Sequence, residues 1–195
     1  MIENLFSSTV FFNEINDFNK KELVDFAYSE KFKNTEGVRK SNFGGWQSED
    51  HYHLTNNPII ETLSKEIYNF KFFKPNVRLI IDGLWINING KGSYNMMHVH
   101  PSCDLAAVFW ISTPLNSGTI VFENPHSFYH NKMKMYSDEV QSKSFQYTSY
   151  NLSPKEGSVI LFPSYLRHAV EVNESDEDRI SASFNVHMEL SLIHI

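Results

Sequence analysis

Two histidines, His98 and His100, are separated by a single residue in the segment HVHPSCD. Alternate side chains of an extended chain point to the same side, so both imidazole rings would face one way. Pro101 has no N–H to donate to a sheet, which suits the end of a strand that opens onto a site. Two such histidines can bind a divalent metal. The alternative is an ordinary surface pair, and the motif alone does not decide between them.

His168 strengthens the metal-site hypothesis. It follows the apolar run VILF at 159–162 and a Pro-Ser turn, which places it near the core rather than in an exposed loop. The alternative is a buried histidine that donates to a backbone carbonyl. Taken alone, the residue fits both descriptions.

Arg179 and Ser181 lie two residues apart in the segment RISASFNV, so one face of a strand would carry both. The planar guanidinium matches a carboxylate, and a hydroxyl adds a further donor. The pair therefore suits the distal carboxylate of a dicarboxylate ligand. In the alternative, Arg179 simply pairs with Asp176, Glu177 or Asp178.

Other reactive residues carry less information. Cys103 is close to the histidine pair, but a Cys-His hydrolase does not need a second histidine, and no nucleophile elbow surrounds the thiol. No glycine-rich loop of the phosphate-binding type is present. The remaining histidines are interpreted as packed or solvated side chains: His51, His53, His126, His130, His187 and His194.

The second part of the chain predicts the strands that would position these residues. Short apolar and β-branched runs alternate with turn-forming segments such as SPKEG and NESDED. Many short strands without helices between them favour an antiparallel sandwich or barrel. The predicted strands are 77–88, 105–112, 118–124, 145–152, 157–163 and 179–190.

The first part of the chain has a partly helical pattern. We expect a strand at 9–15, and a helix at 18–32 for which Asp17 is a plausible N-cap. The segment 39–50 is rich in Gly, Ser and Asn, so it is predicted to be a loop. A second helix is expected at 57–70, where isoleucine and leucine recur at helical spacing.

Length and composition favour a single domain, 1–195, with a helical and loop support at 1–75 and a β core at 76–190. The net charge of −6 argues against a nucleic-acid binder. The single cysteine excludes an intramolecular disulfide and suits a reducing compartment. Neither a signal peptide nor a membrane span is apparent, so a cytoplasmic protein without a membrane partner is expected. The oligomeric state is left open.

Taken in order, the His-x-His pair, the third histidine and the Arg-x-Ser pair resemble the Fe(II)/2-oxoglutarate oxygenases. The chain looks more closely like the small 2OG-Fe(II) oxygenases of bacteria and phages, which are related to the prolyl 4-hydroxylase-like group. The resemblance is therefore compatible with a bacterial or a phage-encoded protein. The resemblance implies a double-stranded β-helix (jelly roll, cupin-like), with Fe(II), 2-oxoglutarate and O₂. The matching stretches are 41–48, 84–101, 117–125, 157–170 and 179–186.

The resemblance also implies roles for particular residues. His98 and His168 match the two histidines of the family, and Arg179 and Ser181 match the pair that holds 2-oxoglutarate. The family usually has an acidic residue two positions after its first histidine, and here that position is His100.

Two assignments remain open. Either His100 replaces the carboxylate and gives a three-histidine site, or Asp104 reaches the metal. We favour His100, because its position matches the carboxylate position of the family directly. Asn89 lies nine residues before His98, where related enzymes contact 2-oxoglutarate; the alternative is an ordinary asparagine at a strand edge or turn.

The predicted function is therefore a dioxygenase that hydroxylates an amino-acid side chain, free or peptidyl, or a small metabolite. In the family, the reaction consumes O₂ and 2-oxoglutarate and releases succinate and CO₂. Two alternatives share the fold, because a fold does not determine a function. One is a cupin-like metal- or ligand-binding protein without turnover, and the other is a capsid-like jelly roll with incidental histidines.

Overall fold

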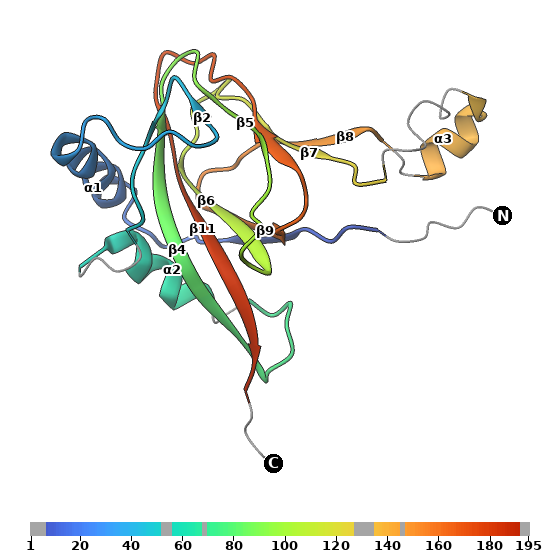
Figure 1. The fold of residues 1–195 in the computed structure, drawn as a ribbon, viewed down its shortest axis with the longest axis horizontal. Helices are drawn as coiled ribbons and strands as arrows, with labels where there is room; N and C mark the ends of the chain where they lie inside the picture. Colours follow the sequence, from blue (N-terminus) through green and yellow to red (C-terminus); the bar gives the residue numbers. More distant parts are fainter. Residues whose placement is uncertain (1–6, 52–55, 68–69, 127–134, 145–146, 192–195) are drawn as a thin grey trace.

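The computed structural model describes residues 7–51, 56–67, 70–126, 135–144 and 147–191 (Figure 1). Its strands form two antiparallel sheets, as the strand pattern predicted. The strands are β1 (Phe11–Glu14), β2 (Asn42–Phe43), β3 (Trp46–Gln47), β4 (Val77–Asn89), β5 (Tyr94–His98), β6 (Leu105–Ser112), β7 (Ile120–Glu123), β8 (Ser149–Leu152), β9 (Ser158–Pro163), β10 (His168–Val170) and β11 (Arg179–Leu190). The helices are α1 (Lys20–Lys33), α2 (Pro58–Ile67) and α3 (Asp138–Ser144).

The larger sheet has the strand order β1-β9-β6-β11-β4-β3, and the smaller one has the order β2-β5-β10-β7-β8. The long strands β4 and β11 lie side by side in the larger sheet (Figure 1). Alternate side chains of these strands point to opposite faces, so one face joins the main core and the other faces the smaller sheet. The fold therefore separates a structural face from a face that can carry a site.

The main core lies between the larger sheet and the helices. Leu84, Ile86 and Phe184 are fully buried on this face of the sheet. Helix α2 covers them with an apolar face of Ile59 and Leu63, as its periodicity predicted. Figure 1 shows α1 and α2 on the same side of β4 and β11.

Helix α1 begins at Lys20, two residues later than expected. The Asn19 side chain accepts a hydrogen bond from the Glu22 backbone N–H at 3.2 Å, so Asn19 is the N-cap and the assignment to Asp17 was wrong. Both residue types suit this position, because either side chain can satisfy a free N–H of the first turn.

The amino-terminal part is more than a helical support. Strands β1 and β3 form the two edges of the larger sheet, and β2 forms an edge of the smaller sheet. The segment predicted as the loop 39–50 therefore contains two short strands. The strand predicted from residue 145 begins at Ser149 instead, and residues 145–146 lie outside the described part of the chain.

The space between the two sheets has two parts. One part is filled by a second apolar cluster that includes Val108, Phe122 and Phe162. The other part is lined by histidine, arginine, serine and asparagine side chains. In the described residues, no helix is both long enough and apolar enough to cross a bilayer.

Candidate metal centre

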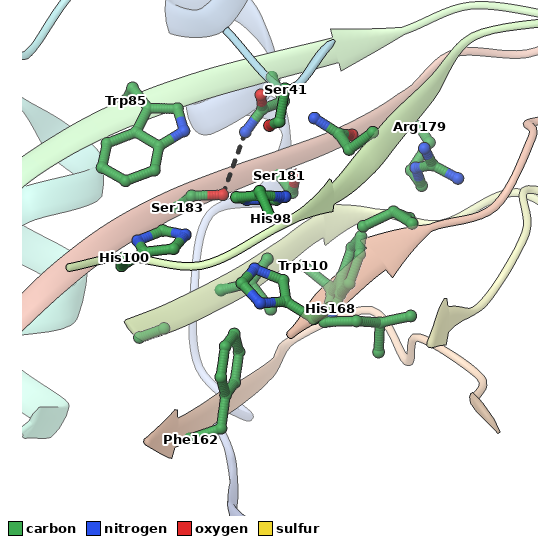
Figure 2. A pocket seen from close by; sticks show the side chains of 16 residues that line it. Ser41, Trp85, His98, His100, Trp110, Phe162, His168, Arg179, Ser181 and Ser183 are labelled. Carbon is green, nitrogen blue, oxygen red and sulfur yellow. Dashed lines mark hydrogen bonds between the residues drawn. The ribbon is translucent and has the colours of Figure 1, made fainter. Parts of the chain in front are cut away.

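Three histidines meet between the sheets. Each of His98, His100 and His168 offers a ring nitrogen, and these atoms all lie within 4.8 Å of one another. His98 ends β5, and its Cα pairs with that of His168 at the start of β10, so the two side chains are cross-strand neighbours. His100 follows β5, where its backbone N–H donates to Ser164 at 3.0 Å. Figure 2 shows the three rings grouped together.

The second nitrogen of each ring is occupied. His98 Nδ1 lies 2.7 Å from the Met96 carbonyl, and His168 Nδ1 lies 2.9 Å from the Leu166 carbonyl. His100 Nδ1 lies 2.7 Å from Asn185 Oδ1. A carbonyl oxygen can only accept, so the proton sits on Nδ1 and each Nε2 keeps its lone pair. This is the arrangement found in histidines that bind metals through Nε2.

Burial keeps the three rings neutral. It lowers the pKa of His98 and of His100, and it lowers the pKa of His168 from 6.5 to about 3, assisted by the proximity of His98. His168 packs edge-on against Phe162 with ring centroids 4.6 Å apart, and Trp85 stacks on His100 at 5.5 Å. Neutral histidines are the form that binds a metal, so no proton has to be displaced near pH 7.

Asp104 and Cys103 do not belong to this cluster. The Asp104 carboxylate accepts a hydrogen bond from the Met188 N–H at 2.8 Å and lies 3.8 Å from His187 Nδ1. Burial raises the pKa of the Cys103 thiol, which disfavours the nucleophilic thiolate. Of the two open third-ligand assignments, only His100 belongs to the cluster.

Arg179 and Ser181 lie on the strand face that looks toward the histidines. Only 2% of Arg179 is exposed, and its Nη1 donates to the carbonyls of Ser117 and Glu171, the latter at 3.0 Å. Within the described part of the chain, no carboxylate pairs with this guanidinium, and burial lowers its pKa to about 10. A buried cation without an anion is costly, so an anionic ligand beside it would be favoured.

The acidic neighbours considered for Arg179 have other partners. Asp176 lies 2.7 Å from Lys91, and Asp178 accepts a hydrogen bond from the Tyr28 hydroxyl at 2.7 Å. The ordinary ion-pair interpretation of Arg179 is therefore not supported for these two residues.

Several polar atoms around the same cavity have no hydrogen-bond partner. Arg179 Nη2, Trp110 Nε1 and Asn87 Oδ1 are all buried and unpaired, and all three residues line the cavity together with the histidines. In Figure 2, Arg179 lies at the opposite end from His100, with Ser181 between them. Buried polar groups are almost always paired in proteins, so these atoms indicate a polar ligand.

Trp110 was not found by sequence reasoning. It sits in the run LAAVFWIS, which is apolar throughout and gives no sign that one position faces a ligand. Its Cα is the partner of Ser181 across the β6–β11 pair, and that pairing alone brings its indole N–H to the cavity.

Asn89 does not line the cavity but contacts a residue that does. Its Nδ2 donates to Asn95 Oδ1 at 2.9 Å, and Asn95 lines the cavity while Asn89 does not. Asn95 reaches the site through a bulge at Met96 and Met97, since His168 pairs with His98 and Val170 pairs with Asn95. The predicted contact between Asn89 and 2-oxoglutarate stays a prediction, and Asn95 is the residue nearer to such a ligand.

The other described histidines lie apart from the cluster. His51 is buried 3.9 Å from Glu30, and His187 lies 3.0 Å from Asp82 at the surface. His53, His130 and His194 lie outside the described residues.

A family model described as "Putative 2OG-Fe(II) oxygenase" matches residues 83–185, more than half of the chain. This range includes the three histidines and the Arg-x-Ser pair. No curated protein sequence matches the chain.

Several solved structures share the fold. SnoK, an alpha-ketoglutarate-dependent carbocyclase of nogalamycin biosynthesis, has a TM-score of 0.64 and 13% identity over 93% of this chain and 80% of that chain. HygX of Streptomyces hygroscopicus, with nickel and 2-oxoglutarate bound, has a TM-score of 0.60 and 11% identity over 92% and 83%. The viral collagen prolyl hydroxylase of Paramecium Bursaria Chlorella virus-1, in complex with 2-oxoglutarate, has a TM-score of 0.57 and 13% identity over 90% and 94%.

At these identities the structural likeness shows the fold, a double-stranded β-helix, as predicted. The matched family model also shows the family, because it covers the strands and the site residues. The chain therefore belongs to the 2OG-Fe(II) oxygenase family, whose members use Fe(II), 2-oxoglutarate and O₂.

Proposed function

We propose that His98, His100 and His168 hold Fe(II), and that Arg179 with Ser181 binds the far carboxylate of 2-oxoglutarate. The enzyme would then hydroxylate an amino-acid side chain or a small metabolite. The observation that carries this proposal is the convergence of three neutral imidazoles whose Nδ1 atoms are occupied and whose Nε2 atoms are free.

The chemistry of these residues fits iron. Imidazole suits Fe(II), and three ligands on one side leave positions for a co-substrate and O₂. Without a carboxylate among the ligands, the site keeps more positive charge, which favours an anionic co-substrate. Asn185 would orient His100, because it accepts the Nδ1 proton of that ring.

The unpaired polar atoms fit a dicarboxylate. Arg179 Nη2 and Trp110 Nε1 are donors without acceptors, and a carboxylate offers several lone pairs. Ser181 lies between Asn87 and Trp110 in the strand pairing, so its hydroxyl is near both. We propose that Arg179, Trp110 and Ser181 hold the far end of 2-oxoglutarate.

When bound, the iron and 2-oxoglutarate supply the oxidising power: O₂ and 2-oxoglutarate are consumed, succinate and CO₂ are released, and one oxygen atom enters a C–H bond of the substrate. The residues of this chain orient the reactants and exclude water. Phe162, Trp85 and Ile120 line the cavity around the histidines with apolar surface. This lining would limit the entry of water beside the reacting atoms.

Hydroxylation is proposed as the reaction by analogy with structures of similar fold. The similar structures include prolyl hydroxylases, one of them in complex with a peptide fragment, and HygX with hygromycin B bound. The fold thus serves both peptide and small-molecule substrates, and both classes remain within the proposal. Family membership favours an oxygenase over the cupin-like binder without turnover and over a capsid-like jelly roll.

A titration tests the co-substrate site. Fe(II)-loaded protein is titrated with 2-oxoglutarate without O₂, and the metal-to-ligand absorption of the chelate is followed. Arg179→Ala should weaken 2-oxoglutarate binding about tenfold to hundredfold, since a charge-assisted hydrogen bond contributes about 1.5–3 kcal/mol. Arg179→Lys should recover part of the loss, because one ammonium cannot reproduce the planar fork. Ser181→Ala should cost on the order of 1 kcal/mol.

Lys91→Ala and Arg167→Ala are the matched controls. These side chains are exposed cations paired with Asp176 and Glu123. Both variants should bind 2-oxoglutarate like the wild type. If the wild type shows no absorption band, the protein does not use 2-oxoglutarate as proposed. If Arg179→Ala binds 2-oxoglutarate like the wild type and a control variant binds it more weakly, the carboxylate is held elsewhere.

A further inference from the structure

An open groove leads from the histidines to the surface. Its volume is about 800 Å³, and Trp85, His98 and His100 line both this groove and the cavity beside Arg179. One wall carries Met96 and Met97, which are 46% and 38% exposed although they are apolar. Such flexible apolar side chains can pack against ligands of varied shape.

A bulge in β4 turns an acidic residue toward this groove. Odd-numbered residues up to Ile81 and even-numbered residues from Leu84 onward belong to the core. The change occurs because Asp82 and Gly83 together oppose a single residue of β11, and Gly83 adopts a φ of +83°. Asp82 therefore lies on the same face as Trp85, at most about 10 Å further along the strand.

The outer end of the groove is acidic. Among the described residues, Glu49, Asp50 and Asp82 line it together with one cation, Lys40. The Asp50 carboxylate accepts the Leu84 N–H at 2.9 Å and so is held in place at the groove.

A buried acceptor on the same groove lacks a donor. Gln47 is 4% exposed, its Oε1 has no hydrogen-bond partner, and it lines the groove. Its Cα pairs with that of Asn87, whose Oδ1 is also unpaired. Two neighbouring acceptors without donors suit a ligand rich in N–H or O–H groups.

We propose that the substrate of this enzyme carries a primary ammonium group on an apolar stem. The groove would hold the ammonium at the outer carboxylates, lay the stem against Met96 and Met97, and present a carbon to the histidine centre. This inference rests on the proposed function. The ammonium can belong to a free amine or to a lysine side chain of a peptide, and the experiment separates the two.

The test uses full-length protein loaded with Fe(II) and 2-oxoglutarate without O₂. Isothermal titration compares n-hexylammonium, n-hexanol and hexanoate, which share a stem and differ in charge. The ammonium should bind about tenfold tighter than the alcohol, since several exposed ion pairs each contribute modestly, and hexanoate should bind weakest. Free L-lysine and a blocked Gly-Lys-Gly peptide, titrated in the same way, distinguish the two sources.

Single substitutions locate the charge effect. Glu49→Gln and Asp82→Asn should each weaken n-hexylammonium binding about twofold to fivefold and leave n-hexanol unchanged. Glu66→Gln is the control, because Glu66 lies on α2 at the other face of the larger sheet. Thermal unfolding checks that each variant is folded.

Equal binding of the ammonium and the alcohol, tighter binding of hexanoate, or wild-type affinities in both groove variants would each overturn the inference. The charge-transfer absorption of the same loaded sample tests the proposed function separately. If the band is present and the ammonium is not preferred, only the substrate class is wrong. If the band is absent, the oxygenase proposal itself fails.

Discussion

The two faces of β4 and β11 differ in how completely their buried groups are paired. On one face, Leu84, Ile86 and Phe184 are fully buried and are covered by the helices. On the other face, Arg179 and Asn87 are almost as buried, yet each has a polar atom without a partner. The same two strands thus carry a face whose contacts are complete and a face whose contacts are not.

This difference separates stability from function within one sheet. The core face gains free energy by removing apolar surface from water, and it needs nothing more. The other face holds a buried guanidinium and unpaired polar atoms, and it looks onto the three histidines of the smaller sheet. Buried polar groups of this kind are unfavourable without a ligand. Substitutions on the first face should therefore change stability, and those on the second should change binding.

The largest effect is expected at the histidines. His98→Ala, His100→Ala and His168→Ala should each abolish stoichiometric Fe(II) binding, measured by anaerobic titration, because each removes one of three ligands. Circular dichroism should show an intact fold. Asp104→Ala is the matched control, and it should bind iron normally because its carboxylate faces Met188 instead.

Two results would contradict this ligand set. Normal iron binding by His100→Ala together with loss in Asp104→Ala would make Asp104 the third ligand. Normal binding by all four variants would remove the metal site from this part of the molecule.

A substitution in the main core should lower stability without removing Fe(II) binding. Phe184→Ala should destabilise the protein by about 3–5 kcal/mol, because it leaves a cavity in a packed interior. Urea unfolding measures the loss. Below its melting temperature, the folded variant should still bind Fe(II).

Ser183→Ala provides the comparison from the neighbouring position on the other face. Its hydroxyl accepts a hydrogen bond from Asn87 at 3.1 Å, so a loss of about 1 kcal/mol or less is expected. If Phe184→Ala does not fold, Ile86→Val should lower stability by about 0.5–1.5 kcal/mol. If the core and site substitutions lower the free energy of unfolding equally, the two faces do not separate stability from function.

The metal-free protein should lose stability in mild acid through its neutral histidines. Burial lowers the pKa of His168 to about 3, so between pH 6.5 and pH 3 the unfolded chain binds a proton that the folded protein does not. This residue therefore leaves stability unaffected above pH 6.5 and lowers it as the pH falls, by at most about 1.4 kcal/mol per pH unit.

His168→Phe removes this titration and keeps a ring beside Phe122 and Phe162. Between pH 7 and pH 5, the wild type should lose up to about 2 kcal/mol more than the variant in urea unfolding. Parallel pH profiles of the two proteins would show that His168 is not held neutral by the fold.

The smallest effect is expected at Cys103. Cys103→Ala and Cys103→Ser should keep most 2-oxoglutarate turnover and normal iron binding. Burial raises the pKa of this thiol, and its Sγ contacts backbone groups, including the His100 carbonyl at 3.8 Å. Succinate release measures turnover. Loss of turnover in a folded, iron-loaded variant would assign the thiol a role in the reaction.

Most of the architecture could be predicted from the sequence, because the strands from Val77 onward alternate or are continuously apolar. Helix α2 was predicted from the spacing of Ile59 and Leu63. The short strands β2 and β3 were missed because two residues have no periodicity, and only pairing with β5 and β4 defines them.

By itself, the sequence determined which residue types are available and in what order: the histidine pair, the later histidine and the Arg-x-Ser pair. Their roles as ligands remain predictions, but their order identified the family that the comparisons show. This succeeded because the alternation of side chains along a strand is a local property that the sequence displays.

Only the tertiary structure decided which residues meet. His168 joins His98 across 70 positions through one strand pair, and Asp104 is turned toward Met188 although it lies four residues from His100. The bulges that bring Asp82 and Asn95 to the site face shift the alternation by one residue. Strand register and bulges depend on hydrogen bonds between distant segments, so no local pattern in the sequence reveals them.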